Sequence, residues 1–254
     1  MSTSRNFLVI GCLVALLVGC GGARLKRHPE PMPELMQPLA SAVDEHLSAS
    51  LDWVIVKNGP GSWAKNADWD EYLLTIRSRG DASVEVLEVI VYDSLDTHLG
   101  SMSDRVMLRA ASQQTIRRYK EAELAVKPGY GTSAMVATGA GLTGGGFMAA
   151  SAVGGWGGLG IAVGTLAFVP VALVAIVAYD AGERSVGRKI TQRATKLPAA
   201  IEPDQPLLVD AFFPFIPSPQ RVEIRYLVNQ SEKTLKLETG AALDGLHLRA
   251  EKRR

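Results

Sequence analysis

Residues 221–238 read RVEIRYLVNQSEKTLKLE, and this stretch decides the fold class. Apolar residues occupy every second position from Val222 to Val228, and charged residues occupy most of the positions between them. This period of two is typical of a strand with one buried face. Residues 229–232 are turn formers, and residues 233–238 repeat the alternation through Leu235 and Leu237. The stretch therefore predicts two strands joined by a turn.

Four more segments have the character of strands. They are Leu207–Phe213, Trp53–Val56, Trp69–Arg77 and Val84–Tyr92. Within Val84–Tyr92 the apolar alternation changes phase, which indicates a β-bulge. Six short strands separated by turns predict a mainly β protein with helices, built as an immunoglobulin-like β-sandwich.

The strands fall into an N-terminal part, residues 39–127, and a C-terminal part, residues 199–248, which a basic tail follows at 249–254. Neither part has enough strands to cover a core, so we expect the two to complete one interrupted sandwich.

Two helices are expected in the N-terminal part. Residues 37–50 carry Leu39, Val43 and Leu47 at a spacing of four, which indicates a short helix. Residues 101–126 form a second helix, with Ser101 or Ser103 as its cap. Apolar and small residues are predicted on its inner side, and basic residues are predicted on its solvent side: Arg105, Arg109, Arg117 and Lys120.

Residues 128–198 interrupt the sandwich. No charged residue and no histidine occurs from Pro128 to Tyr179. Leu159–Tyr179 is apolar over about the 20 residues that cross a bilayer, and Thr132–Val153 is a weaker, Gly-rich candidate. The turn GGWGG at 154–158 joins them. The segment predicts an apolar, Gly-rich helical hairpin with basic flanks.

Small residues recur every four positions along both arms of this hairpin. The positions are Ser133, Ala137, Gly141, Gly145 and Ala149 on the first arm and Gly160 and Gly164 on the second. The pattern resembles the glycine-zipper segments of bacterial envelope proteins, which implies close helix packing in lipid or between protomers. A hairpin buried in a water-soluble core is the alternative. The basic flanks suit anionic head groups, and they oppose the usual charge bias across an inner membrane.

The first residues carry an export signal. Phe7–Val18 is an apolar run too short for a comfortable span, and it ends in Leu17-Val18-Gly19-Cys20. These four residues resemble the lipobox of bacterial lipoproteins. The resemblance implies a signal peptide at 1–19, a diacylglycerol on Cys20 and, because Gly21 follows, transfer to the outer membrane facing the periplasm. Residues 20–38 are Pro-rich and predict an extended tether.

Other functional classes find little support in the chain. Its only cysteines are Cys12 and Cys20, so the mature protein has neither a disulfide nor a thiolate metal site. The four histidines are scattered, and no metal or other cofactor is expected. A net charge of +1 argues against nucleic acid as a partner.

Further local motifs have structural explanations. GAGLTG at 139–144 matches a dinucleotide fingerprint, but it lacks the strand and the acidic residue that such a site needs. Asp68, Asp70 and Glu71 suggest a solvated strand edge rather than paired catalytic carboxylates. Trp63 and Trp69 form either an aromatic contact patch or part of the core.

The sequence thus predicts a lipid-anchored envelope protein that is not an enzyme. Its expected role is structural or in assembly, through a hairpin that inserts in the membrane or oligomerises, with copies of itself or envelope-complex subunits as partners. The alternative is a lipid-anchored module that binds a peptide, glycan or lipid and uses the hairpin only as a second anchor.

Overall fold

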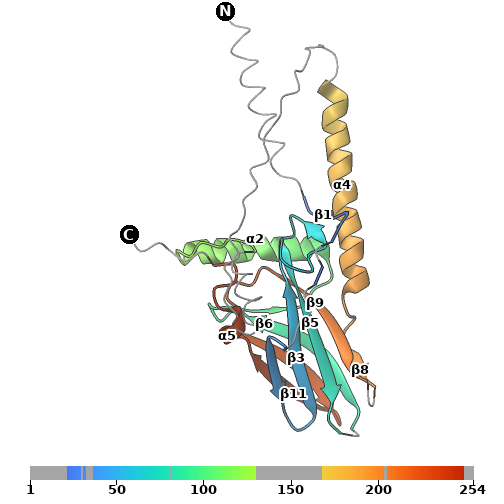
Figure 1. The fold of residues 1–254 in the computed structure, drawn as a ribbon, viewed down its shortest axis with the longest axis vertical. Coiled ribbons are helices and arrows are strands. Elements are labelled where there is room, and N and C mark those ends of the chain that lie inside the picture. Colours follow the sequence, from blue (N-terminus) through green and yellow to red (C-terminus); the bar gives the residue numbers. More distant parts are fainter. Residues whose placement is uncertain are drawn as a thin grey trace, which may run out of the picture.

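The computed structural model describes residues 22–29, 31–32, 37–80, 82–129, 168–202 and 205–248. The elements, in chain order, are β1 (Arg24–Leu25), β2 (Ala40–Val43), β3 (Leu47–Ile55), β4 (Ala64–Lys65), β5 (Trp69–Ser78), β6 (Val84–Tyr92), β7 (His98–Gly100), α2 (Arg105–Glu121), α4 (Phe168–Arg193), β8 (Ala199–Ile201), β9 (Leu207–Pro214), β10 (Arg221–Val228), β11 (Ser231–Glu238) and α5 (Gly240–Leu243). The predicted mainly β character is confirmed (Figure 1).

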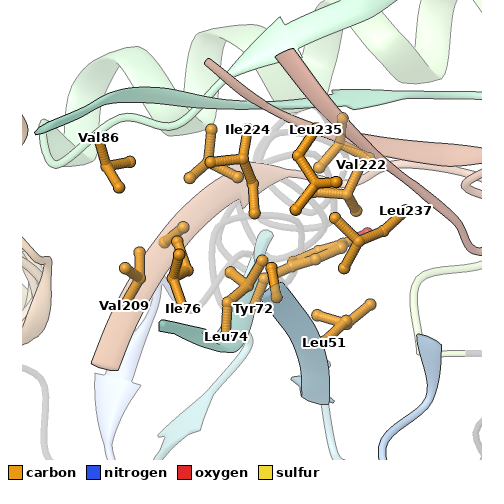
Figure 2. Close-up of a cluster of buried hydrophobic side chains, with 14 of the residues drawn as sticks. Leu51, Tyr72, Leu74, Ile76, Val86, Val209, Val222, Ile224, Leu235 and Leu237 are labelled. Carbon is orange, nitrogen blue, oxygen red and sulfur yellow. The ribbon is translucent and has the colours of Figure 1, made fainter. Parts of the chain in front are cut away.

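Two antiparallel sheets enclose the main core. One has the strand order β2-β3-β5-β9, and the other has the order β11-β10-β6-β7, with β8 also pairing with β6. Figure 2 shows apolar side chains from the two sheets pointing toward one another. Those labelled there are Leu51, Tyr72, Leu74, Ile76 and Val209 from the first sheet and Val86, Val222, Ile224, Leu235 and Leu237 from the second. Each such buried aliphatic side chain contributes about 1.5–3 kcal/mol to folding.

The hairpin of β10 and β11 follows the predicted alternation. Val228 pairs with Ser231, so Asn229 and Gln230 alone form the turn. Both have positive φ angles, 49° and 65°, which a tight hairpin turn of matching twist requires and which asparagine tolerates better than most residues. Leu235 and Leu237 are buried while their neighbours are exposed. The prediction of two strands joined by a turn is confirmed.

Each sheet combines strands from both sides of the 128–198 segment. β9 pairs with β5 from Trp69 to Ile76, and β10 pairs with β6 along its whole length. The two parts of the chain therefore share one core.

The predicted bulge in β6 is present. Val86 pairs with Tyr226 and Glu88 pairs with Arg225, so Leu87 is an extra residue with no partner on β10. The bulge explains the phase change, since it lets residues on both sides of Leu87 keep their apolar side chains in the core.

The helix predicted over residues 37–50 is wrong. This region forms β2 and the start of β3, joined by a turn in which Asp44 accepts hydrogen bonds from the N–H groups of His46 and Leu47. A spacing of four is an even number, so it is compatible with one face of a strand as well as with a helix.

α2 lies within the predicted range, but its cap is Asp104 rather than either serine. The Asp104 side chain accepts a hydrogen bond from the N–H of Met107. The predicted second arm, Leu159–Tyr179, is helical from Phe168 onward, and α4 continues through charged residues to Arg193. The first arm and the GGWGG turn lie outside the described residues.

Within the described part of the chain, no helix is both long and apolar enough to cross a membrane.

Candidate functional site

The chain is attached to the domain immediately after the predicted lipidation site. Ala23 is buried, and its N–H donates a 2.6 Å hydrogen bond to the carboxylate of Glu183 in α4. β1 then pairs with β4, and the N–H of Lys26 donates to the carbonyl of Trp63. Within the predicted tether, residues 24–25 are extended as a strand, and residues 23–26 lie against the domain. Backbone hydrogen bonds and the burial of Ala23 hold residues 23–26 on the domain.

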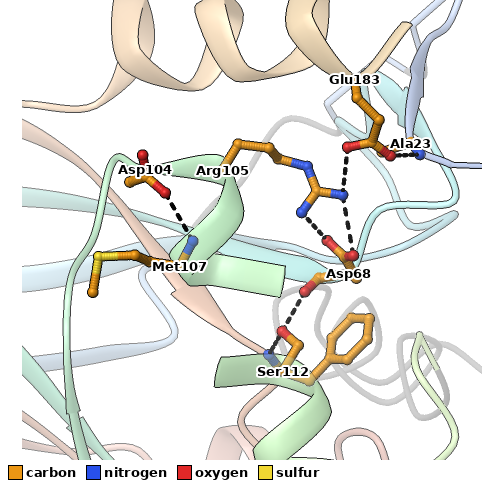
Figure 3. A network of polar contacts seen from close by, with 8 residues as sticks. Ala23, Asp68, Asp104, Arg105, Met107, Ser112 and Glu183 are labelled. Atoms are coloured by element: carbon orange, nitrogen blue, oxygen red, sulfur yellow. Dashed lines mark hydrogen bonds and ion pairs between the residues drawn. The ribbon is translucent and has the colours of Figure 1, made fainter. Parts of the chain in front are cut away.

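A buried arginine joins three elements at this point, which we call the anchor junction (Ala23, Asp68, Arg105 and Glu183). The Arg105 guanidinium lies 2.7 Å from Asp68 and 3.1 Å from Glu183, and Figure 3 shows it between the two carboxylates. It also lies 5.0 Å from the centre of the Trp69 ring. Two carboxylates and an aromatic face compensate the guanidinium for the water it loses.

The prediction that Arg105 faces solvent is wrong. The side chain is only 9% exposed, because Arg105 belongs to the same helical stripe as Leu108, Ser112, Thr115 and Tyr119. The spacing of three and four residues places Arg105 on this stripe, and two carboxylates of the domain allow its charge to be buried there.

A second apolar core supports the junction. Val186 and Ile190 of α4 pack with Trp63, Trp69 and Leu108. The two tryptophan rings have centroids 5.5 Å apart. Of the two explanations for these tryptophans, burial in a core is the one that the structure bears out.

The end of α4 is attached to β5 and β9. Arg193 donates to Glu71 at 2.6 Å and lies 3.5 Å from Asp210, while the Trp63 indole N–H donates to the other oxygen of Glu71 at 2.6 Å. Burial raises the pKa of Glu71, although Arg193 and the Trp63 hydrogen bond act to lower it. Burial likewise raises the pKa of Asp210. The solvated edge predicted around Glu71 is therefore wrong.

A histidine–aspartate pair fixes the chain just before the Gly-rich segment. His247 Nε2 lies 2.8 Å from Asp70, and both side chains are fully buried. His247 Nδ1 accepts a hydrogen bond from the N–H of Gly129, so Nε2 carries the ring hydrogen and donates it to Asp70. The carbonyl of His247 accepts from Lys127 at 2.7 Å. His247 thus binds the backbone of both Lys127 and Gly129.

The His247–Asp70 pair is enclosed by the domain. Asp70 also accepts from the N–H of Ile216, and both members of the pair are closed to solvent. Among the described residues, no group of three histidine, cysteine or acidic side chains is placed to hold a metal ion.

A cleft of about 470 Å³ opens beside the end of α4. Its lining includes Thr191, Thr195, Lys196, Asp210 and Phe212, a mixture of hydroxyl, charged and apolar groups.

The predicted site residues lie outside the described part of the chain. They are Cys20, Ser133, Ala137, Gly141, Gly145, Ala149, Gly160 and Gly164. The structure adds the contacts on either side of these residues, at Ala23 and Glu183 and at Gly129 and His247. No local sequence motif predicts these contacts, because the residues that make them are far apart in the chain.

Comparison with protein-family models, with curated proteins and with solved structures found no match.

Proposed function

We propose that this chain is a membrane-anchored envelope lipoprotein with a structural or assembly role. In this proposal the lipid on Cys20 and the apolar segment that ends at Tyr179 enter the same membrane, side by side. The observation that carries it is the hydrogen bond between the N–H of Ala23 and Glu183 of α4.

Chain length supports a common point of entry. Cys20 precedes Ala23 by three residues, which limits the separation of their Cα atoms to about 11 Å. Glu183 follows Tyr179 by four residues, or about 6 Å of helix. The proposal therefore brings the acylated cysteine within reach of the membrane surface that the last uncharged residues of α4 would meet.

The direction of α4 supports the same conclusion. Phe168–Tyr179 contains no charged residue and measures about 18 Å as a helix. In Figure 1 this part of α4 rises away from the sheets, whereas its C-terminal part packs on the second core. An uncharged helix that projects from a domain needs lipid or another protein around it.

The finer features of the proposal concern the class of sandwich and the hairpin that interrupts it. We propose an immunoglobulin-like sandwich interrupted by a helical hairpin, whose small-residue stripe through Gly141 and Gly145 packs against a helix of the same or another copy. Gly21 and the basic flanks favour the outer membrane, reached from the periplasm. The assembly partners would be copies of this chain or other envelope subunits.

Metabolic labelling with an alkyne fatty acid tests the anchor. The wild type should be labelled and fractionate with outer membranes, and Cys20→Ser should take up no label. A membrane-impermeant maleimide tests the segment in intact envelopes, using otherwise wild-type chains that carry one new cysteine, since an acylated Cys20 has no free thiol. Ala149→Cys and Val163→Cys should be protected, while Gln230→Cys, in the exposed β10–β11 turn, should react once the outer membrane is opened. Equal fatty-acid labelling of Cys20→Ser, or free reaction at 149 and 163, would contradict the proposal.

The cleft beside Asp210 favours a second candidate, a lipid-anchored binding module for a peptide, glycan or lipid. Deletion of residues 132–179 separates the two. If the shortened protein folds and keeps full function in cells, the binding module is the better explanation.

A further inference from the structure

The outer face of α2 combines exposed apolar and basic side chains. Val106 and Met107 are 75% and 61% exposed at the start of the helix. The helix carries five basic residues and one acidic residue, Glu121. Arg105 and Arg118 are engaged with carboxylates of the domain, whereas Arg117 and Lys120 are exposed. Basic residues therefore outnumber the acidic one within α2, and two large apolar side chains are exposed at its start. Exposed Asp104 and Glu123 lie just beyond the two ends of the helix.

This face lies at the end of the domain from which α4 rises. Figure 1 shows α2 running across that end of the sheets, beside α4. The two helices meet closely, because a Cβ atom at Gly187 would lie 3.3 Å from the Cβ of Arg105. Gly187 follows Tyr179 by eight residues, or about 12 Å along α4. The half-thickness of α2 covers about 5–6 Å of this rise, and extended arginine and lysine side chains reach across the rest.

We infer that the outer face of α2 rests on an anionic lipid surface. Arg117 and Lys120 would bind phosphate head groups, and Val106 and Met107 would lie at the head-group layer beside them. The inference rests on the proposed function, since it takes Cys20 and the start of α4 to enter the membrane at this end. Charge complementarity identifies the occupant, because basic residues beside exposed apolar ones are the features by which helices bind anionic interfaces.

The opposite end of the domain provides a control position. Val228 pairs with Val84 at the start of β6, whereas Asp93, just past the other end of β6, pairs with Arg118 of α2. The nine residues of β6 separate these ends by about 30 Å. Gln230, exposed in the turn after Val228, therefore lies far from α2.

The experiment uses the full mature chain with Cys20→Ser, reconstituted into vesicles by detergent removal. A polarity-sensitive fluorophore is attached to Met107→Cys or, as the control, to Gln230→Cys. Vesicles contain phosphatidylcholine with increasing fractions of phosphatidylglycerol. We expect the emission at position 107 to shift to the blue as phosphatidylglycerol increases, and high salt to reverse the shift. Position 230 should not respond.

Charge substitutions test the role of the basic residues. Arg117→Glu/Lys120→Glu should raise the phosphatidylglycerol fraction needed for half of the shift, or abolish the shift, because each basic residue near an anionic surface is worth about fivefold in binding. Lys233→Glu/Lys236→Glu makes the same change of charge on β11 and should leave the shift intact.

Three results would overturn the inference. The first is a blue shift of the emission at position 107 that is equally large in pure phosphatidylcholine. The second is no blue shift at position 107 although residues 149 and 163 are buried in the same vesicles. These leave the proposed function standing, because the segment still inserts. The third is a blue emission without vesicles, with crosslinks between copies at position 107, which would assign the face to a second copy. Exposure of residues 149 and 163 in the vesicles would instead count against the proposed function.

Discussion

The carboxylate of Glu183 accepts a 2.6 Å hydrogen bond from the N–H of Ala23, although 160 residues separate the two in the chain. Its other oxygen lies 3.1 Å from the Arg105 guanidinium. One side chain of α4 thus connects the start of the domain to α2, and the stability of the anchor junction depends on it.

Loss of the Arg105 charge should destabilise the protein strongly. Arg105→Met leaves Asp68 and Glu183 without their cation, and we expect the free energy of unfolding to fall by about 2–4 kcal/mol, somewhat below the value for fully buried pairs because Asp68 is partly exposed. Urea unfolding of the Cys20→Ser protein in mild detergent, followed by tryptophan fluorescence, measures this. Arg117→Met, at an exposed position of the same helix, is the control, and equal stability of the two variants would contradict the role of the junction.

Two glycines of α4 should respond differently to alanine. A Cβ atom at Gly182 would meet the flexible side chain of Arg24, whereas one at Gly187 would lie 3.3 Å from the Cβ of Arg105, whose guanidinium is held by carboxylates. Alanine is favoured over glycine in a helix by about 1 kcal/mol, so Gly182→Ala should be stabilising. Gly187→Ala should gain less or lose stability. The same gain in both would show that α2 and α4 are not tightly packed.

Asp44 should stabilise the fold at neutral pH and not in acid. Burial acts to raise its pKa, but hydrogen bonds from Leu47, Tyr226 and His46 outweigh it and leave the pKa below 3.8. A carboxylate with a lowered pKa contributes stability above its unfolded pKa and loses it as the pH falls through the folded value. Asp44→Asn should therefore cost about 1 kcal/mol at pH 7 and less below about pH 4. A cost that does not change with pH would argue against the charge as its source.

His247→Ala should release Gly129 selectively. The Gly129 N–H donates to the imidazole, whereas the Lys127 N–H donates to the backbone carbonyl of His247, which alanine retains. We expect faster hydrogen exchange at Gly129 with little change at Lys127, measured in a background of Asp70→Asn so that no unpaired carboxylate is buried. Equal acceleration at both amides would mean that the whole C-terminal segment had detached.

The elements that the sequence predicts correctly are those whose pattern is local. β10, β11 and the bulge at Leu87 follow from alternation within a few residues, because only one face of each strand meets the core. The predicted helix at 37–50 failed because apolar residues four apart suit either period. Here the side chain of Asp44 accepts backbone hydrogen bonds in a turn, so the region forms two strands instead of a helix.

The buried polar pairs could not be predicted in the same way. Asp70 and His247 are 177 residues apart, and Ala23 and Glu183 are 160 apart, so no spacing connects them. Asp, His and Glu are residue types of the surface when taken alone, and only the tertiary fold brings these partners together. The predicted lipid acceptor and the small-residue stripe remain predictions, since they lie outside the described residues.

Strands from both chain halves sit next to each other in each sheet, and this has a consequence for the order of events during synthesis. β5 and β6 must wait for β9 and β10 before the core can close, by which time residues 130–167 have already emerged. The apolar segment therefore meets its surroundings while the domain is still open. A chaperone that shields this segment would therefore be needed before the core closes rather than afterwards.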